Sequence, residues 1–154
     1  MTLYFAYGSN MSGALMRPRC PSARALGVGE LSGHRFVITT DGYASIVRAP
    51  GSSVHGLLWR LTPRDLAALN AYESLASGLY RIETMPIRLG ARRVAALVYV
   101  GRSRAPGPPR PGYLELVLAA AGELALPAAY RKSLARLLPT GLRASRAAAA
   151  GEAA

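Results

Sequence analysis

Short apolar runs separated by turn residues dominate the first two thirds of the chain. The apolar, aromatic-rich run at 2–7 has the composition of a buried first strand. Further strands are predicted at 24–31, 34–39, 43–48, 53–60, 79–89 and 91–101. The turn signals that separate them are Gly33, Asp41-Gly42, Pro50-Gly51 and Leu89-Gly90.

Helical signals are fewer and are spread over both halves of the chain. Thr62-Pro63-Arg64-Asp65 combines an N-cap threonine, a proline at the first helical position and a capping-box acid. The helix that starts there should run to Tyr72, with Glu73 at its end. A short helix is predicted at 11–17, ending before Pro18. Two more are predicted at 113–125 and 128–138.

Many short strands followed by terminal helices indicate an α+β protein with a small, mixed but mostly antiparallel, barrel-like sheet and a few flanking helices. The proline-rich segment 105–112 is interpreted as a surface loop, because too few residues follow it for a second domain. We therefore expect one domain at 1–140. The Ala-rich tail at 141–154 is expected to be flexible.

Composition removes several classes of protein. Hydrophobic residues make up 51% of the 154 residues, which excludes wholesale disorder. No apolar run reaches the ~18 residues of a membrane span, and the N-terminus lacks the features of a signal peptide. We therefore expect a cytoplasmic protein that does not associate with a membrane.

The residues that bind metals are scarce. The single cysteine, Cys20, excludes an internal disulfide and a cysteine-cluster site. His34 and His55 lie in strand-like runs without an acid or cysteine at ligand spacing, so both are expected to be structural or surface residues. The prediction is a protein that uses no metal and no cofactor.

The charge is strongly positive, with 19 Lys and Arg against 8 Asp and Glu and a formal net charge of +11. Such a charge attracts carboxylates and phosphates. The arginines are spread along the whole chain and no nucleic-acid-binding motif accompanies them. Nucleic acid is therefore a disfavoured partner, and a small acidic molecule is the preferred one.

The segment Tyr7-Gly8-Ser9-Asn10 is the sharpest local signal for chemistry. A strand that ends in Gly-Ser-Asn can present backbone N–H groups to an oxyanion or a carboxylate. It can equally be an ordinary turn after a strand. Ser9 lacks a histidine–acid partner in its sequence context, so a binding contact fits it better than a nucleophilic role.

Glu73 is the best candidate among the few acids. At the C-terminal end of a helix the dipole disfavours negative charge, and burial would raise the pKa of the carboxyl in the same direction. A glutamate with a pKa near ~6–7 can take and return a proton at neutral pH. The alternative is an exposed glutamate at a helix end. Asp65 is accounted for as a capping residue, and the remaining acids have no flanking loop that would build a pocket: Glu30, Asp41, Glu83, Glu115, Glu123 and Glu152.

The N-terminal segment Tyr4-Phe5-Ala6-Tyr7-Gly8-Ser9-Asn10-Met11 closely resembles the signature of the gamma-glutamylcyclotransferase family. Five further segments resemble that family in the same order and extend the likeness over about residues 3–138. They are Gly56-Leu57-Leu58-Trp59, Leu69-Asn70-Ala71-Tyr72-Glu73-Ser74, Ser77-Gly78-Leu79-Tyr80, Pro111-Gly112-Tyr113 and Leu126-Pro127-Ala128-Ala129-Tyr130.

The resemblance implies a fold, a site and a reaction. It implies a catalytic carboxylate at Glu73 and pocket tyrosines at Tyr80 and Tyr113. The implied substrate loop consists of Tyr7, Gly8, Ser9 and Asn10. The implied reaction is the cyclisation of a γ-glutamyl amide to 5-oxoproline, with release of an amine or amino acid. Tyr-Gly-Ser-Asn differs from the Tyr-Gly-Ser-Leu typical of the glutathione-specific branch, which makes glutathione a less favoured substrate.

Two other functions stay open at this point. The same pocket could bind an acidic metabolite without turning it over. A basic accessory protein for nucleic acid is the third and less favoured possibility. The leaving group of the reaction and the oligomeric state are not determined by these patterns.

Overall fold

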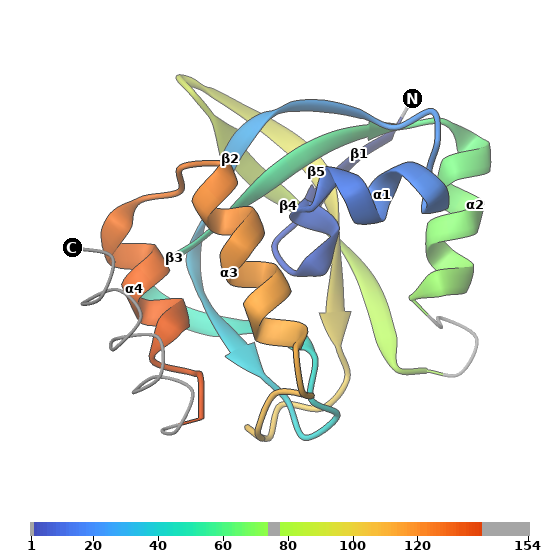
Figure 1. Cartoon of the computed structure of the whole chain (residues 1–154). Coiled ribbons are helices and arrows are strands. Elements are labelled where there is room, and N and C mark those ends of the chain that lie inside the picture. Colours follow the sequence, from blue (N-terminus) through green and yellow to red (C-terminus); the bar gives the residue numbers. More distant parts are fainter. Residues whose placement is uncertain (1, 74–77, 140–154) are drawn as a thin grey trace.

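The fold is a closed five-stranded barrel with helices packed on its outside (Figure 1). A computed structural model describes residues 2–73 and 78–139. The predicted tail at 141–154, and Ser74 and Ser77 of the quoted motifs, lie outside the described residues. The strands are β1 (Thr2–Ala6), β2 (Arg24–Ile38), β3 (Ala44–Leu61), β4 (Tyr80–Leu89) and β5 (Arg92–Gly101). The helices are η1 (Ser9–Met11, a 3₁₀ turn), α1 (Gly13–Arg19), α2 (Pro63–Tyr72), α3 (Tyr113–Glu123) and α4 (Ala128–Ala135).

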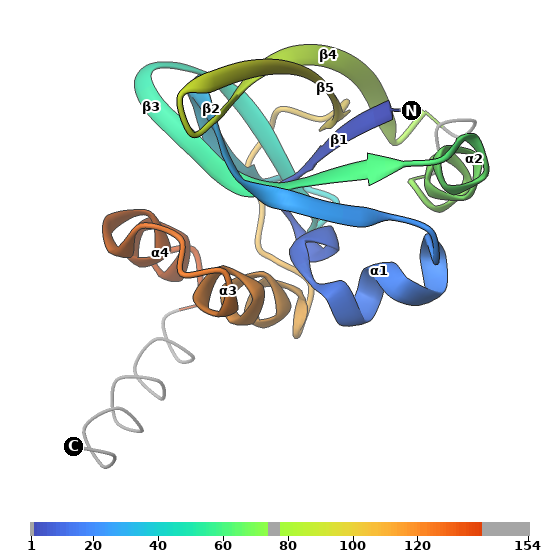
Figure 2. The ribbon, with the colours of Figure 1, turned by 90° about the horizontal axis from the view of Figure 1, so that it is seen from above.

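The strand order around the barrel is β1-β3-β2-β4-β5. All neighbours pair antiparallel except β1 and β5, which pair parallel where Tyr4 lies beside Leu97. The predicted α+β class and its mixed, mostly antiparallel barrel are therefore confirmed. In Figure 2, α1, α3 and α4 lie on one side of the barrel, and β4 and β5 form the opposite side. No helix in the described part of the chain is long and apolar enough to span a membrane.

The prediction of four short strands between residues 24 and 60 is wrong, because two long strands replace them. Gly33 and Pro50-Gly51 were expected to be turns. Instead the ladder shifts register there, from Ser32 paired with Ser53 to His34 paired with Arg48. A bulge of this kind bends a strand without ending its pairing, which lets one hairpin curve around a barrel.

The turn predicted at Asp41-Gly42 is confirmed, and it holds the loop that follows β5. The Gly42 amide donates to the Thr39 carbonyl at 2.9 Å, which closes the turn between β2 and β3. Segment 105–112 is a loop, as predicted, and packs against this turn. The Thr40 amide donates to the Ala105 carbonyl at 3.0 Å, and Arg110 Nε donates to the Asp41 carbonyl at 3.0 Å. The loop thereby leads directly into α3.

The short N-terminal helix was predicted to end before Pro18. It runs two residues further, to Arg19, and Pro18 lies inside its last turn. A proline removes one amide donor from a helix. That loss is confined to one position here, since the Cys20 amide still donates to the Met16 carbonyl at 2.7 Å and Met16 is buried in the core. As a consequence, Arg19 ends the helix and belongs to its ordered part.

The capping box of α2 is confirmed. Thr62 Oγ accepts from the Asp65 amide at 3.1 Å, and the Asp65 carboxylate accepts from the Thr62 amide at 3.4 Å. The same carboxylate also accepts from the Ser22 amide at 3.4 Å, and Cys20 Sγ lies 3.4 Å from the Asp65 carbonyl. Burial raises the pKa of the Cys20 thiol to about 11. These contacts join α1 to α2 and make Cys20 a packing residue.

The remaining elements follow the sequence closely. β4 and β5 form the predicted hairpin around Leu89-Gly90. The helix expected at 113–125 is α3, and the one expected at 128–138 is α4, which ends at Ala135. Both contribute leucines to the core under the barrel wall: Leu114, Leu118 and Leu134.

The barrel depends on a close approach between β1 and β3 at Gly56. A Cβ at this position would lie 2.2 Å from the Ala6 carbonyl oxygen. We predict that Gly56→Ala lowers the free energy of unfolding by on the order of 1–3 kcal/mol, because backbone on both sides must move. Gly122→Ala, on the exposed side of α3 with open space around it, should instead stabilise by about 0.5 kcal/mol through helix propensity. Urea unfolding of both variants measures the difference, and equal effects would contradict the prediction.

Candidate active site

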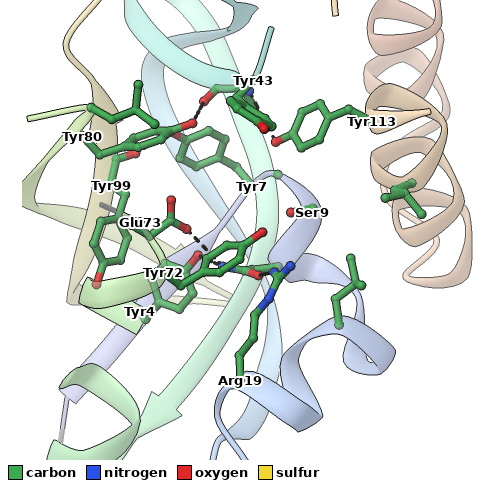
Figure 3. Close-up of a pocket in the computed structure, with 16 residues that line it drawn as sticks. Tyr4, Tyr7, Ser9, Arg19, Tyr43, Tyr72, Glu73, Tyr80, Tyr99 and Tyr113 are labelled. Atoms are coloured by element: carbon green, nitrogen blue, oxygen red, sulfur yellow. Dashed lines mark hydrogen bonds between the residues drawn. The ribbon is translucent and has the colours of Figure 1, made fainter. Parts of the chain in front are cut away.

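A cavity of about 300 Å³ opens on the outside of the barrel, where β1, β4 and β5 meet η1, α1, the end of α2 and the start of α3 (Figure 3). All seven residues predicted from the sequence line it. They are Tyr7, Gly8, Ser9, Asn10, Glu73, Tyr80 and Tyr113. The other lining residues were not predicted and are Tyr4, Leu15, Arg19, Tyr43, Ala44, Tyr72, Leu79, Tyr99 and Leu116.

Glu73 is the C-cap residue of α2, and its amide donates to the Leu69 carbonyl at 2.8 Å. Its carboxylate points into the cavity (Figure 3), where Oε1 accepts from Asn10 Nδ2 at 3.2 Å. Burial raises the pKa of the Glu73 carboxyl to about 7, and the positive charge of Arg19 opposes the rise. The helix-end position agrees with the sequence, but desolvation is the main cause of the shift. A carboxyl with this pKa is both an acid and a base at neutral pH.

Asn10 is held in one orientation by contacts on every side. Its Oδ1 accepts from Arg19 Nη1, and its Nδ2 donates to the Tyr4 hydroxyl at 3.1 Å as well as to Glu73. The Asn10 backbone carbonyl accepts from Trp59 Nε1 at 3.0 Å. Because Oδ1 is occupied by a cationic donor, the amide must present Nδ2 to the carboxylate. The contacts of Asn10 therefore aim a hydrogen-bond donor at Glu73.

The turn at Gly8 brings backbone close to a tyrosine hydroxyl. The 3₁₀ turn begins with the Met11 amide donating to the Gly8 carbonyl at 3.1 Å, so the preceding amides have no partner within the turn itself. A Cβ on Gly8 would lie 2.8 Å from the Tyr113 hydroxyl. That hydroxyl also accepts from the Ala44 amide at 3.3 Å. Gly8 is thus the residue that allows Tyr113 to reach the loop.

Hydroxyl groups line the wall opposite α1. Tyr80 donates to the Ala44 carbonyl at 3.0 Å, and Tyr7 donates to the Tyr99 carbonyl. Burial raises the pKa of Tyr113 to about 12, and it also raises the pKa values of Tyr7 and Tyr80 well above their ordinary value. These phenols are neutral in any physiological buffer. The wall can therefore form hydrogen bonds to a ligand without adding negative charge beside Glu73.

Arg19 is the most important residue that the sequence reasoning missed. Its guanidinium stacks on the Tyr72 ring, with 3.6 Å between Cζ and the ring centroid. The only signal in the sequence was a basic residue at the end of a short helix, and that helix was predicted to stop before Pro18. Tyr4 and Tyr99 were missed for another reason, since an aromatic residue on a strand is usually part of the core. No cluster of three His, Cys, Asp or Glu side chains within residues 2–73 and 78–139 could hold a metal ion.

Comparison with known proteins places this chain in a family. The family described as "Gamma-glutamyl cyclotransferase, AIG2-like" matches residues 4–115. The human and bovine proteins named gamma-glutamylcyclotransferase are 29% and 30% identical to it over 148 residues, which is 89% of this chain and 79% of theirs. A solved structure named gamma-glutamyl cyclotransferase superposes with a TM-score of 0.81 at 26% identity and covers 86% of this chain and 85% of its own. The chain belongs to the gamma-glutamyl cyclotransferase, AIG2-like family.

The raised pKa of Glu73 predicts a pH-dependent effect on stability. An exposed glutamate titrates near ~4.3, so folding favours the protonated form, and this stabilisation is lost as the pH rises through about 7. Glu73→Gln cannot ionise. The free energy of unfolding of Glu73→Gln, relative to that of the native protein, should therefore rise by up to about 3 kcal/mol between pH 5 and pH 9. Chemical unfolding at several pH values tests this, with Glu123→Gln at the exposed end of α3 as the control. A difference that does not change with pH would refute the raised pKa.

Proposed function

We propose that this protein is an active cyclotransferase that converts a γ-glutamyl amide to 5-oxoproline and a free amine or amino acid. The observation that carries the proposal is Glu73, a carboxyl with a pKa of about 7 inside a cavity walled by tyrosines. Membership of the family supports the reaction class. The net charge of +11 favours a substrate that carries a carboxylate.

The reaction joins two ends of one molecule. The α-amine of the γ-glutamyl group attacks its own γ-carbonyl carbon, a C–N bond forms, and the C–N bond to the leaving amine breaks. Because nucleophile and electrophile are already tethered, the protein mainly has to hold the folded conformer. A cavity of about 300 Å³ lined by rigid aromatic rings suits that task.

Glu73 moves the protons. As a carboxylate it takes a proton from the α-ammonium, which frees the lone pair for attack. The attacking nitrogen gives up a second proton as the tetrahedral intermediate collapses, and both protons reach the departing amine, which leaves as an ammonium. Glu73 ends as the carboxylate it was at the start. A pKa near 7 suits both directions of transfer.

The loop after β1 is the proposed binding site for the carbonyl oxygen. Backbone amides at Gly8, Ser9 and Asn10 precede the first hydrogen bond of the 3₁₀ turn, and such amides can stabilise an oxyanion. The Ser9 amide is already directed at the Tyr113 hydroxyl, where it lowers that pKa. The amides of Gly8 and Asn10 are therefore the better candidates. Tyr80 and Tyr113 are proposed to contact the charged end of the substrate.

Release of 5-oxoproline tests the activity directly. The native protein is expected to release it from at least one member of a panel of γ-glutamyl amino acids, γ-glutamyl amines and glutathione, as measured by mass spectrometry. Glu73→Gln should lower the rate by about 10²–10⁴-fold, because the amide is nearly isosteric but cannot accept a proton. Glu123→Gln should leave the rate unchanged. A folded native protein that is silent across the panel would overturn the proposal and favour a metabolite-binding role.

The pH profile of kcat/KM tests the link between Arg19 and Glu73. The acid limb should report the Glu73 pKa near 7. Since the Arg19 charge lowers that pKa, Arg19→Met should move the limb to higher pH while the alkaline limb stays in place. Arg17→Met, in the same helix, removes an equal charge and lies outside the cavity lining. Equal movement in both variants would assign the effect to net charge alone.

A further inference from the structure

A second cavity, of about 360 Å³, is lined by β2, β3, β4 and β5 of the closed barrel. β2 and β3 pair along most of their length, and so do β4 and β5. β2 and β4 pair only where Glu30 lies beside Arg88. These two pairs of strands form most of the barrel wall, and β1 joins them between β3 and β5 (Figure 2). The ladder between β2 and β4 does not continue beyond this pair, and the second cavity is lined by residues from all four strands.

The register places this cavity on the inner face of the barrel. Arg81 pairs with Val100 and Met85 with Ala96, and successive residues of a strand point to opposite faces. Tyr80 and Tyr99 line the Glu73 cavity, whereas their neighbours Arg81 and Val100 line the second one. The two cavities are therefore separate and are divided by the wall that β4 and β5 form.

The rim of the second cavity is cationic. Three arginines reach it from three segments: Arg48 from β3, Arg81 from β4 and Arg104 from the chain after β5. Among the described lining residues the only acid is Glu83, which binds Arg81 Nε at 3.1 Å. One carboxylate cannot neutralise three guanidinium groups, so the rim keeps a positive potential.

The floor of the cavity is apolar. Ile46 and Val100 are each only 4% exposed, and Met85 packs against the barrel core. Small barrels hold ligands at such openings, where an apolar interior meets a polar rim. A cationic rim above an apolar floor matches a molecule that has an anionic head and an apolar body.

We propose that the second cavity binds a small organic anion, with its phosphate or carboxylate on Arg48, Arg81 and Arg104 and its apolar body on Ile46, Met85 and Val100. This site does not share a residue with the Glu73 cavity. Guanidinium groups bind phosphate and carboxylate with paired hydrogen bonds, which gives such a site its preference for planar or tetrahedral oxyanions.

Phenyl phosphate is the probe, because it combines both features in one molecule. Titration of the ¹⁵N-labelled full chain, followed by NMR at about 0.15 M salt to screen diffuse attraction, should shift amides around Arg81 and Val100 in a saturable manner. Inorganic phosphate and phenol, each lacking one feature, should bind several-fold more weakly. Equal affinity for inorganic phosphate would overturn the role of the apolar floor.

Matched charge variants separate a site from general attraction to a basic protein. Arg48→Gln should raise the dissociation constant for phenyl phosphate about tenfold, consistent with loss of one charged hydrogen-bond donor. Arg93→Gln, exposed on β5 outside the cavity, should have no effect, and Glu83→Gln should tighten binding. Equal weakening by the two arginine variants, shifts confined to the Glu73 cavity, or no saturable shift by about 10 mM phosphate ester would each overturn the proposal. None of these readouts depends on release of 5-oxoproline.

Discussion

A carboxyl group that is removed from water raises its pKa unless donors and charges compensate, and at Glu73 the compensation is partial. One amide hydrogen of Asn10 reaches the carboxylate, and the positive charge of Arg19, which binds the same asparagine, lowers the pKa of Glu73. More donors would lower the pKa and make the group a poor acid, while fewer would leave it neutral. The loop after β1, the last turn of α1 and the end of α2 are all arranged around this balance.

The same strands line two cavities, because successive side chains of a strand point to opposite faces of the barrel wall. On β4 and β5, Tyr80 and Tyr99 point outward to the Glu73 cavity, while Arg81 and Val100 point inward to the second cavity. The outward cavity is completed by helices and by the loop that leads to Tyr113. The inward one is lined by residues of β2, β3, β4 and β5 and by Arg104. A single hairpin therefore separates a hydroxyl-lined site that holds Glu73 and Arg19 from a site whose rim is cationic.

Local sequence patterns predicted many of the structural elements of this protein. The capping box at Thr62 and Asp65, the β4–β5 hairpin and the end of α2 at Glu73 depend on residues close in sequence, and the structure has each of them as predicted. The prediction of turns at Gly33 and Pro50-Gly51 was wrong, because a bulged ladder between distant segments outweighed the local turn preference. The prediction that the first helix ends before Pro18 was wrong for a similar reason, since burial of Met16 keeps the last turn in place.

By itself the sequence determined most helix segments, the β4–β5 hairpin, the basic charge, the family resemblance and seven of the residues that line the Glu73 cavity. Those features follow from short-range periodicity and from motifs that can be read in order. Only the tertiary structure decided that Asn10 joins Arg19 to Glu73, and that Arg48, Arg81 and Arg104 converge on one opening. Such contacts join residues far apart in the chain, and their distances depend on how the barrel closes, which no local pattern encodes.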